Sequence, residues 1–153
     1  MTKDYPWGKG TPTWTRDATA DDSDKSFTVP AGKVWDLVAI ESTLVATATV
    51  GNRQLQFIIT NGVATVYTGT RAPNITASQA GVALWDFSNG DGYSAAQVRV
   101  RLDTLAGPNV YVTCPEAKTI LPAGYVIRVY DAAAVDAAAD DLTVVLHYVE
   151  YDA

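Results

Sequence analysis

The sequence predicts an all-β protein: a jelly-roll-like β-sandwich of about 8–10 short strands with an extended N-terminal arm. Three observations favour this fold class. Runs rich in Val, Ile, Thr and aromatic residues are separated by turn residues along most of the 153-residue chain. Asn61-Gly62 joins two such runs, as in a β-hairpin. The tripeptide Pro-Ala-Gly occurs twice, at residues 30–32 and 122–124, each time between two strand-like segments.

The first 24 residues differ in composition from the rest, and we expect an extended arm over residues 1–24 and a single sandwich domain over residues 25–153. Between Tyr5 and Trp14, proline, glycine and large aromatic residues are mixed without a helical or strand period. Proline fixes φ and removes a hydrogen-bond donor, which favours an extended backbone. Because tryptophan and tyrosine are costly to leave in water, we expect residues 1–16 to pack either on their own domain or on a neighbouring chain.

From residue 25 onward, alternating and apolar runs predict about nine strands. The longest run, residues 33–49, is apolar on both parities in its first half, as expected for a strand within a two-layer sandwich. The expected strands are residues 26–29, 33–49, 52–60, 63–68, 81–87, 97–103, 109–114, 124–130 and 142–151.

The two Pro-Ala-Gly segments are an internal similarity, because residues 27–34 and 119–126 each run from a short strand into a long apolar one. With proline at the second turn position and glycine able to take a positive φ, each would reverse or sharply bend the chain. Two similar corners suggest that the sandwich has two similar halves, which the two Greek keys of a jelly roll would provide. The alternative is that the two turns resemble each other by coincidence. The alanine-rich segment 131–141 predicts either one or two helical turns or an acidic crossover. Residues 76–83 predict a short helical turn.

Composition argues against several classes of function. Hydrophobic residues make up 48% and charged residues 18%, and 11 basic against 17 acidic side chains give a net charge of −6. Nucleic acid and anionic lipid surfaces both require clustered Lys and Arg. One cysteine cannot form an internal disulfide, and one histidine cannot build a multi-histidine metal site. No apolar run predicts a transmembrane helix, and the first residues do not match a signal peptide, so we expect folding in a reducing cytoplasm.

Residues that carry chemistry are sparse, and the sequence predicts no catalytic, metal or cofactor site. His147, the only candidate histidine base, lies in an alternating strand, where a lone histidine is typically a packing or edge residue. Cys114 has no basic neighbour in the sequence and is expected to be a small buried apolar group. Two possibilities stay open: a glycosidase-type pair of carboxylates, and a calcium ion in an irregular loop.

The aromatic residues are the remaining candidates for function. Trp35 and Trp85 fall in expected strands and are predicted to belong to the core. Tyr5, Trp7 and Trp14 lie in the arm, which has no core of its own. We predict that these three residues bind a partner, because interfaces concentrate binding energy in buried Trp, Tyr and Arg. The alternative is that the arm folds back on its own sandwich.

Turn and strand patterns from about Phe27 to Tyr151 resemble small structural proteins of tailed-bacteriophage virions of the jelly-roll type, many of them capsid decoration (cement) proteins. The segments that carry the resemblance are residues 28–35, 49–53 with the following strand and Asn61-Gly62 turn, 121–124 and 149–151. The aromatic arm is not part of the match. The resemblance implies a homotrimer on the outside of the head lattice, in contact with the major capsid protein and with neighbouring copies of itself.

We therefore expect a non-enzymatic virion protein on the capsid exterior, assembled in the host cytoplasm, that stabilises the major capsid lattice by binding the assembled shell. We expect no cofactor, no nucleic-acid partner and no membrane partner. The alternatives are a tail or head-fibre module that binds carbohydrate or another receptor, and a hydrolase with two carboxylates. If the arm docks on the shell, deleting residues 1–16 is expected to leave the domain folded and to weaken shell binding.

Overall fold

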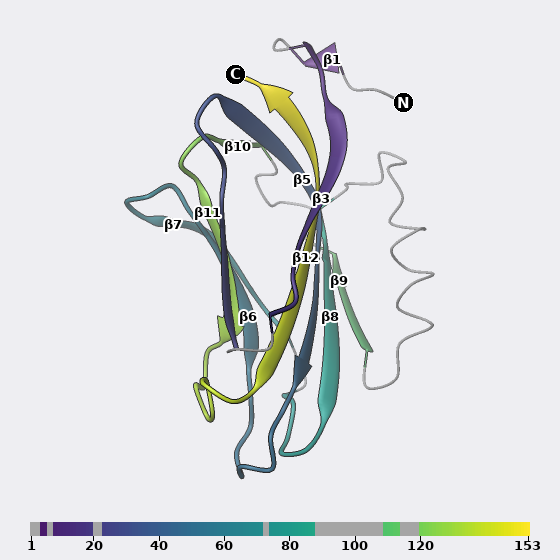
Figure 1. The fold of residues 1–153 in the computed structure, drawn as a ribbon, viewed down its shortest axis with the longest axis vertical. Coiled ribbons are helices and arrows are strands. Elements are labelled where there is room, and N and C mark those ends of the chain that lie inside the picture. The colour runs from purple at the N-terminus through teal and green to yellow at the C-terminus, as the bar shows by residue number, and fades with distance from the viewer. Residues whose placement is uncertain (1–3, 6–7, 20–22, 72–73, 88–108, 114–119) are drawn as a thin grey trace.

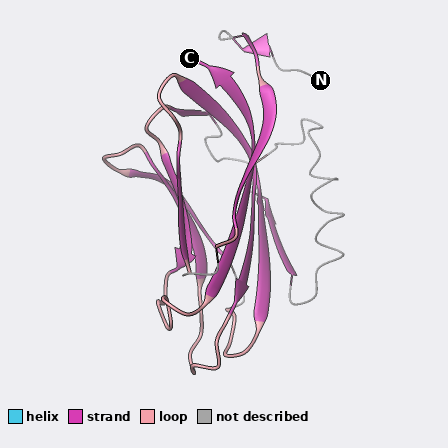
Figure 2. Cartoon of the chain, in the orientation of Figure 1, coloured by secondary structure: helices cyan, strands magenta, loops and turns pink. Residues whose placement is uncertain are grey.

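The computed structural model describes residues 4–5, 8–19, 23–71, 74–87, 109–113 and 120–153, and all regular structure in these ranges is β (Figure 2). Most strands belong to two large sheets that face each other, and β1 and β2 form a small ribbon (Figure 1). The all-β sandwich predicted from the sequence is confirmed. The strands are β1 (Asp4–Tyr5), β2 (Gly8–Lys9), β3 (Thr11–Asp17), β4 (Asp24–Thr28), β5 (Lys33–Val45), β6 (Leu55–Thr60), β7 (Thr65–Thr70), β8 (Ala80–Asp86), β9 (Asn109–Thr113), β10 (Ile120–Pro122), β11 (Val126–Asp131) and β12 (Asp141–Asp152).

The strand order identifies the sandwich as a jelly roll. One sheet has the order β3-β12-β5-β8-β9, with β10 also paired to β5, and the other has the order β4-β11-β6-β7. Eight of these strands form antiparallel pairs that are nested along the sequence, the first with the last: β3 with β12, β4 with β11, β5 with β8, and β6 with β7. This nested hairpin is rolled up by two further pairings, β12 with β5 and β11 with β6. The result is the double Greek key of a jelly roll.

The two Pro-Ala-Gly corners meet at one end of the sandwich. Lys33 donates its backbone N–H to the carbonyl of Pro30 at 3.2 Å, and Gly32 between them has a φ of 74°. Residues 122–125 repeat this turn with a φ of 85° at the glycine, and Val29 hydrogen-bonds to the second corner through both its N–H and its C=O. A positive φ at the third position is the requirement of a type II turn. The proline therefore stands at the first turn position, and the prediction of the second position was wrong.

The core lies between the two large sheets and contains both tryptophans predicted for it. Trp85 is fully buried and meets the ring of Phe57 edge to face, with 5.1 Å between the ring centroids. Trp35 is 4% exposed. Other buried core residues come from both sheets: Phe27, Val29, Leu37, Ile40, Leu44, Ala46, Leu55, Ile59, Ile75, Ala83, Phe87, Leu121, Ile127, Val129, Leu142, Val144, Leu146 and Tyr148.

A β-bulge explains why both odd- and even-numbered residues of β5 face the core. The register between β5 and β12 shifts so that Val38 stands between the paired residues Leu37 and Ala39. Leu37 and Ile40 then both face the core. Val38 and Ala39 join a second apolar cluster with residues of β8 and β12: Val82, Leu84 and Val149.

The two segments with helical character form turns. Residues 132–140 form the crossover from β11 to β12 without a helix, and they include one i→i+4 turn in which Asp140 donates its backbone N–H to the carbonyl of Asp136 at 2.9 Å. Residues 76–79 form a turn in which Gln79 donates its backbone N–H to the carbonyl of Thr76 at 3.2 Å. The strand expected at residues 97–103 and the residue Cys114 lie outside the described residues.

Candidate interaction surface

β3, which falls within the expected arm, is an edge strand of the larger sheet. Its residues pair with β12 along their whole length, from Thr11 opposite Glu150 to Asp17 opposite Val144. Of the two places expected for the arm, this part therefore packs on its own domain. The division of the chain at residue 24 stays a prediction, because the segment that joins β3 to β4 is only partly described.

The inward side of β3 is fixed to the core. Thr15 Oγ1 lies 2.9 Å from the hydroxyl oxygen of Tyr148, a hydrogen-bond distance. The Tyr148 ring stacks on Trp35, with 4.1 Å between the ring centroids. The indole N–H of Trp35 in turn donates to the carboxylate of Glu150 at 3.0 Å. This chain of contacts holds the backbone of β3 against the sheet.

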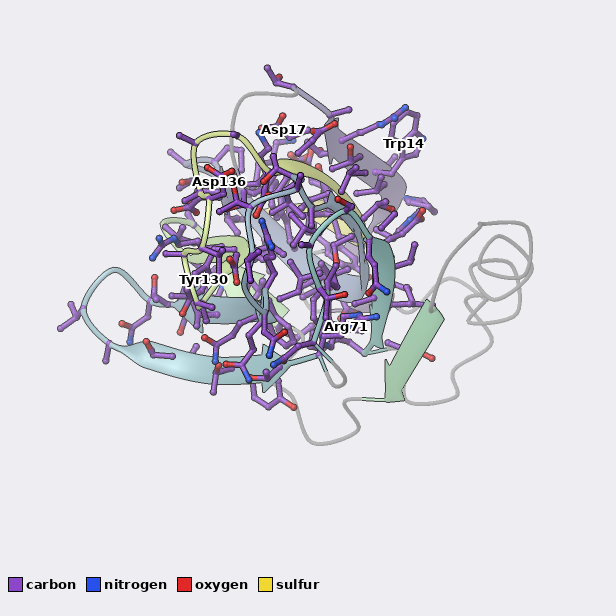
Figure 3. The ribbon with its side chains drawn as sticks, turned by 90° about the horizontal axis from the view of Figure 1, so that it is seen from below. Trp14, Asp17, Arg71, Tyr130 and Asp136 are labelled. Carbon is purple, nitrogen blue, oxygen red and sulfur yellow. The ribbon has the colours of Figure 1, made fainter. Side chains whose placement is uncertain are left out.

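The outward side of β3 carries Trp14, whose side chain is not packed in the core. Successive residues of a strand point to opposite faces, and Trp14 alternates with the half-buried residues Thr13 and Thr15. Trp14 is 65% exposed, and it is the one aromatic residue among the exposed large hydrophobic residues of the described ranges. Figure 3 shows its ring at the margin of the molecule, directed away from the sandwich. Arg16 is exposed on the same face.

His147 lies opposite Trp14 on β12 and is part of this surface. Its side chain is 23% exposed, and Nε2 lies 3.6 Å from Oε2 of Glu41 on the neighbouring strand β5, an ion-pair distance when the imidazole is protonated. The histidine thus sits within the sheet next to an edge strand, which agrees with its interpretation as a packing or edge residue.

The other two residues predicted to bind a partner are not brought together with Trp14 by the described structure. Tyr5 belongs to β1, but its side chain lies outside the described part of the chain, as does the whole of Trp7. Their role as partner-binding residues stays a prediction.

A buried ion pair at one end of the sandwich holds the loops together. Arg53, fully buried, donates from Nε and Nη2 to the two carboxylate oxygens of Asp140, at 2.8 and 3.2 Å. Asp140 also accepts the backbone N–H of Thr47 at 2.8 Å. Asp136 accepts the hydroxyls of Thr47 and Thr49 at 2.6 and 2.8 Å. These acids are engaged as structural acceptors that fix the loops before β6 and β12.

Hydrogen bonds shift the acidity of both carboxyl groups. Burial raises the pKa of Asp140, but the hydrogen bonds from Arg53 and Thr47 outweigh burial and hold that pKa below its ordinary value. The hydroxyls of Thr47 and Thr49 likewise lower the pKa of Asp136. Both groups are therefore ionised at neutral pH. Nothing in the local sequence signals the pairing of Arg53 with Asp140, because the two residues are 87 positions apart.

Within the described ranges, no group of three or more His, Cys, Asp or Glu side chains is placed to hold a metal ion. The described residues also contain no helix of the length and apolarity that would cross a membrane.

No family model and no curated protein sequence matches this chain. Solved structures with a similar arrangement include the coat protein of tobacco streak virus, with a TM-score of 0.37, 8% identity, and coverage of 93% of this chain and 88% of that one. An exo-β-agarase gives a TM-score of 0.36 at 12% identity, over 95% of this chain but 20% of the agarase. A chain of infectious bursal disease virus, Gt strain, gives 0.31 at 14% identity, over 91% and 31%. Likenesses this weak do not assign a function.

Proposed function

We propose that this chain is a non-enzymatic structural protein of a bacteriophage virion, a capsid decoration protein that binds the outside of the head shell. Its partners are the major capsid protein and neighbouring copies of itself, arranged as a trimer. The double Greek key supports this proposal because it is the fold that the resemblance of residues 27–151 implies. The net charge of −6 supports a surface that does not hold nucleic acid.

The exposed Trp14 is the observation that carries the proposal. An indole that is 65% exposed is costly in water, whereas a tryptophan covered by a partner is among the strongest anchors of an interface. The backbone below it is held by the contacts of Thr15, so little ordering is required when a partner covers the ring. Pro12 in the same strand disfavours the addition of another strand at this edge. We therefore assign the contact to the outward side chains of β3.

Binding of this kind stabilises a shell without any chemical step. A protein that binds the assembled lattice and not its dissociated subunits favours the assembled state by mass action. If a substitution removes one side chain of the interface, the lost binding free energy is measured as a lower occupancy of the protein on the shell.

The test compares Trp14→Ala with the wild type for binding to purified phage heads that lack the protein. We expect the dissociation constant to rise by about tenfold or more, the effect of removing an interface anchor. Val50→Ala, at a side chain that is 91% exposed outside β3, is the matched control and keeps wild-type binding. Wild-type occupancy of the Trp14→Ala protein contradicts the proposal. Loss of glycan binding in that variant, with no binding of either protein to heads, favours the carbohydrate-binding alternative.

The structure changes one expectation from the sequence. Deleting residues 1–16 removes almost all of β3 and uncovers the edge of β12. We now expect this deletion to destabilise the domain, so that weaker shell binding would not identify a docking residue. The single substitution at Trp14 leaves the strand in place and is the sharper experiment.

A further inference from the structure

We propose that β7 is a pairing edge through which two copies of this chain join, β7 against β7, in an antiparallel contact around a two-fold axis. The contact would extend the sheet β4-β11-β6-β7 into one continuous sheet across both copies. The inference rests on strand geometry and charge, and it does not depend on the proposed function.

Among the described strands, β3, β4 and β7 are antiparallel strands at the ends of the strand order in the two large sheets, and they differ in the residues that protect their open sides. Proteins protect open edges with charged residues, proline or bulges, because unpaired N–H and C=O groups accept strands of other chains. β3 contains a proline and two charged residues, and β4 contains two charged residues. β7, with the sequence Thr-Val-Tyr-Thr-Gly-Thr, contains neither. It has a register shift at its hairpin end, at Val66, which leaves residues 67–70 in regular pairing.

Hydrogen bonding to β6 identifies the groups that face outward. Just beyond the strand, Arg71 donates its backbone N–H to the carbonyl of Leu55 at 2.8 Å, so residue 71 faces β6. Alternate residues of an antiparallel strand direct N–H and C=O to opposite sides. Thr68 and Thr70 therefore direct these groups away from β6, where no described strand pairs with β7. Both residues are exposed.

The distribution of charge favours a second copy as the occupant of this edge. From Gln54 to Thr70 the sequence has no charged residue, whereas the whole chain carries −6. Two copies meet at this hairpin without the like-charge repulsion that opposes contact between other parts of their surfaces. A partner that binds through charged residues has no charged side chain to bind between Gln54 and Thr70. Val63 and Val66 of the hairpin are 95% and 41% exposed, and they supply apolar surface for a second copy to cover.

A two-fold axis at Gly69 gives a register that satisfies the open groups. Thr68 of one copy then lies opposite Thr70 of the other, and such cross-strand threonine pairs are stabilising. Gly69 brings no side chain to the axis, and the space on its inner side is filled by the ring of Phe57. This contact is two-fold, so it is separate from the three-fold contact that a trimer requires.

The test measures the mass of the isolated protein in solution by light scattering and sedimentation over a range of concentrations. In the double variant Thr68→Lys/Thr70→Lys, like charges face each other across the axis. We expect the wild type to reach about twice the mass of this variant. The double variant Thr11→Lys/Thr28→Lys is the matched control: it adds the same charge at exposed threonines of β3 and β4 and is expected to keep the wild-type mass.

Mixing gives a second readout that a folding defect cannot imitate. The Thr68→Lys/Thr70→Lys protein is combined with a Thr68→Glu/Thr70→Glu protein, so that each lysine of one copy lies opposite a glutamate of the other. We expect each to stay at the lower mass alone and the mixture to recover the higher mass. Equal masses for the wild type and the lysine variant at every concentration overturn the proposal, as does a mixture that stays at the lower mass. No capsid is present, so these outcomes are independent of the Trp14 test.

Discussion

β3 and β7 are both edge strands of this sandwich, and they treat their open sides in opposite ways. β3 has a proline and two charged residues along its backbone and displays Trp14, 65% exposed, on its outward face. β7 has no charge and no proline, and its exposed side chains are mostly threonine. One strand offers a side chain and the other offers backbone groups. The difference teaches that two edges of one jelly roll can expose different kinds of group, and the two proposals assign one edge to a partner surface and the other to a second copy.

The Arg53–Asp140 pair joins the loops that precede β6 and β12, the neighbours of the two edge strands, and the largest effect is expected there. Arg53 lies just before β6, which pairs with β7. Asp140 lies just before β12, which pairs with β3. Arg53→Met leaves the carboxylate of Asp140 buried without its cation, which costs about 3–5 kcal/mol. Urea unfolding at neutral pH measures this loss. A loss under about 1 kcal/mol would contradict the stabilising role assigned to this ion pair.

Acidification of the same two proteins supplies the control. The pKa of Asp140 is depressed in the folded wild type, so its contribution to stability is present above the unfolded value of about 4 and is lost as the pH falls through the folded pKa. In Arg53→Met the carboxyl of Asp140 loses the hydrogen bonds from Arg53, so its pKa is expected to rise relative to the wild type, and protonation relieves the cost of the buried charge. The stability difference between the proteins is therefore expected to shrink as the pH falls. A difference that is constant with pH contradicts this assignment.

A smaller effect is expected from the β7 side alone. A Cβ at Gly69 would overlap the ring of Phe57, which is fully buried in the core. Gly69→Ala therefore forces β7 away from that ring and destabilises the domain by about 1–3 kcal/mol. Thermal unfolding measures the change, and binding to heads through Trp14 should be unaffected. A neutral Gly69→Ala would show that β7 is loosely attached and sharpen the contrast with β3.

The smallest effect is expected on the β3 side. Thr15→Val keeps the shape of the side chain and removes the hydrogen bond to the Tyr148 hydroxyl, at a cost of about 1 kcal/mol. Thr13→Val is the control, since among the described residues the Thr13 hydroxyl donates to a neighbouring backbone group, the carbonyl of Thr11. Urea unfolding of the two variants separates them. Equal stabilities would mean that the Thr15 contact does not anchor β3.

Local chemistry in the sequence was sufficient to predict most strands. Asn61-Gly62 lies in the connection between β6 and β7, and both Pro-Ala-Gly corners turn the chain as glycine with positive φ allows. The sequence predicts an extended arm where the structure has β3, because the nearby proline and glycine residues obscure the alternation of threonine with Trp14 and Arg16. The threonines at alternate positions were the available signal.

What the sequence could not provide is contact between distant residues. The Arg53–Asp140 pair joins loops 87 positions apart, and the bulge at Val38 depends on the register of β12. The exposure of Trp14 also follows only from tertiary pairing, because the same residue on the inward side of β3 would be buried. The sequence pattern proposed Trp14 as a partner-binding residue, and the structure adds that its ring is exposed on a strand fixed to the core.

The central claim is that this domain acts by docking on a larger particle through the outward face of β3. Electron microscopy of the intact virion, at a resolution that shows side chains, tests it most directly. The account predicts density for this jelly roll on the outside of the head, with the Trp14 ring covered by a neighbouring chain. A particle without this chain, or one in which the Trp14 ring faces solvent while another surface makes the contact, would contradict it.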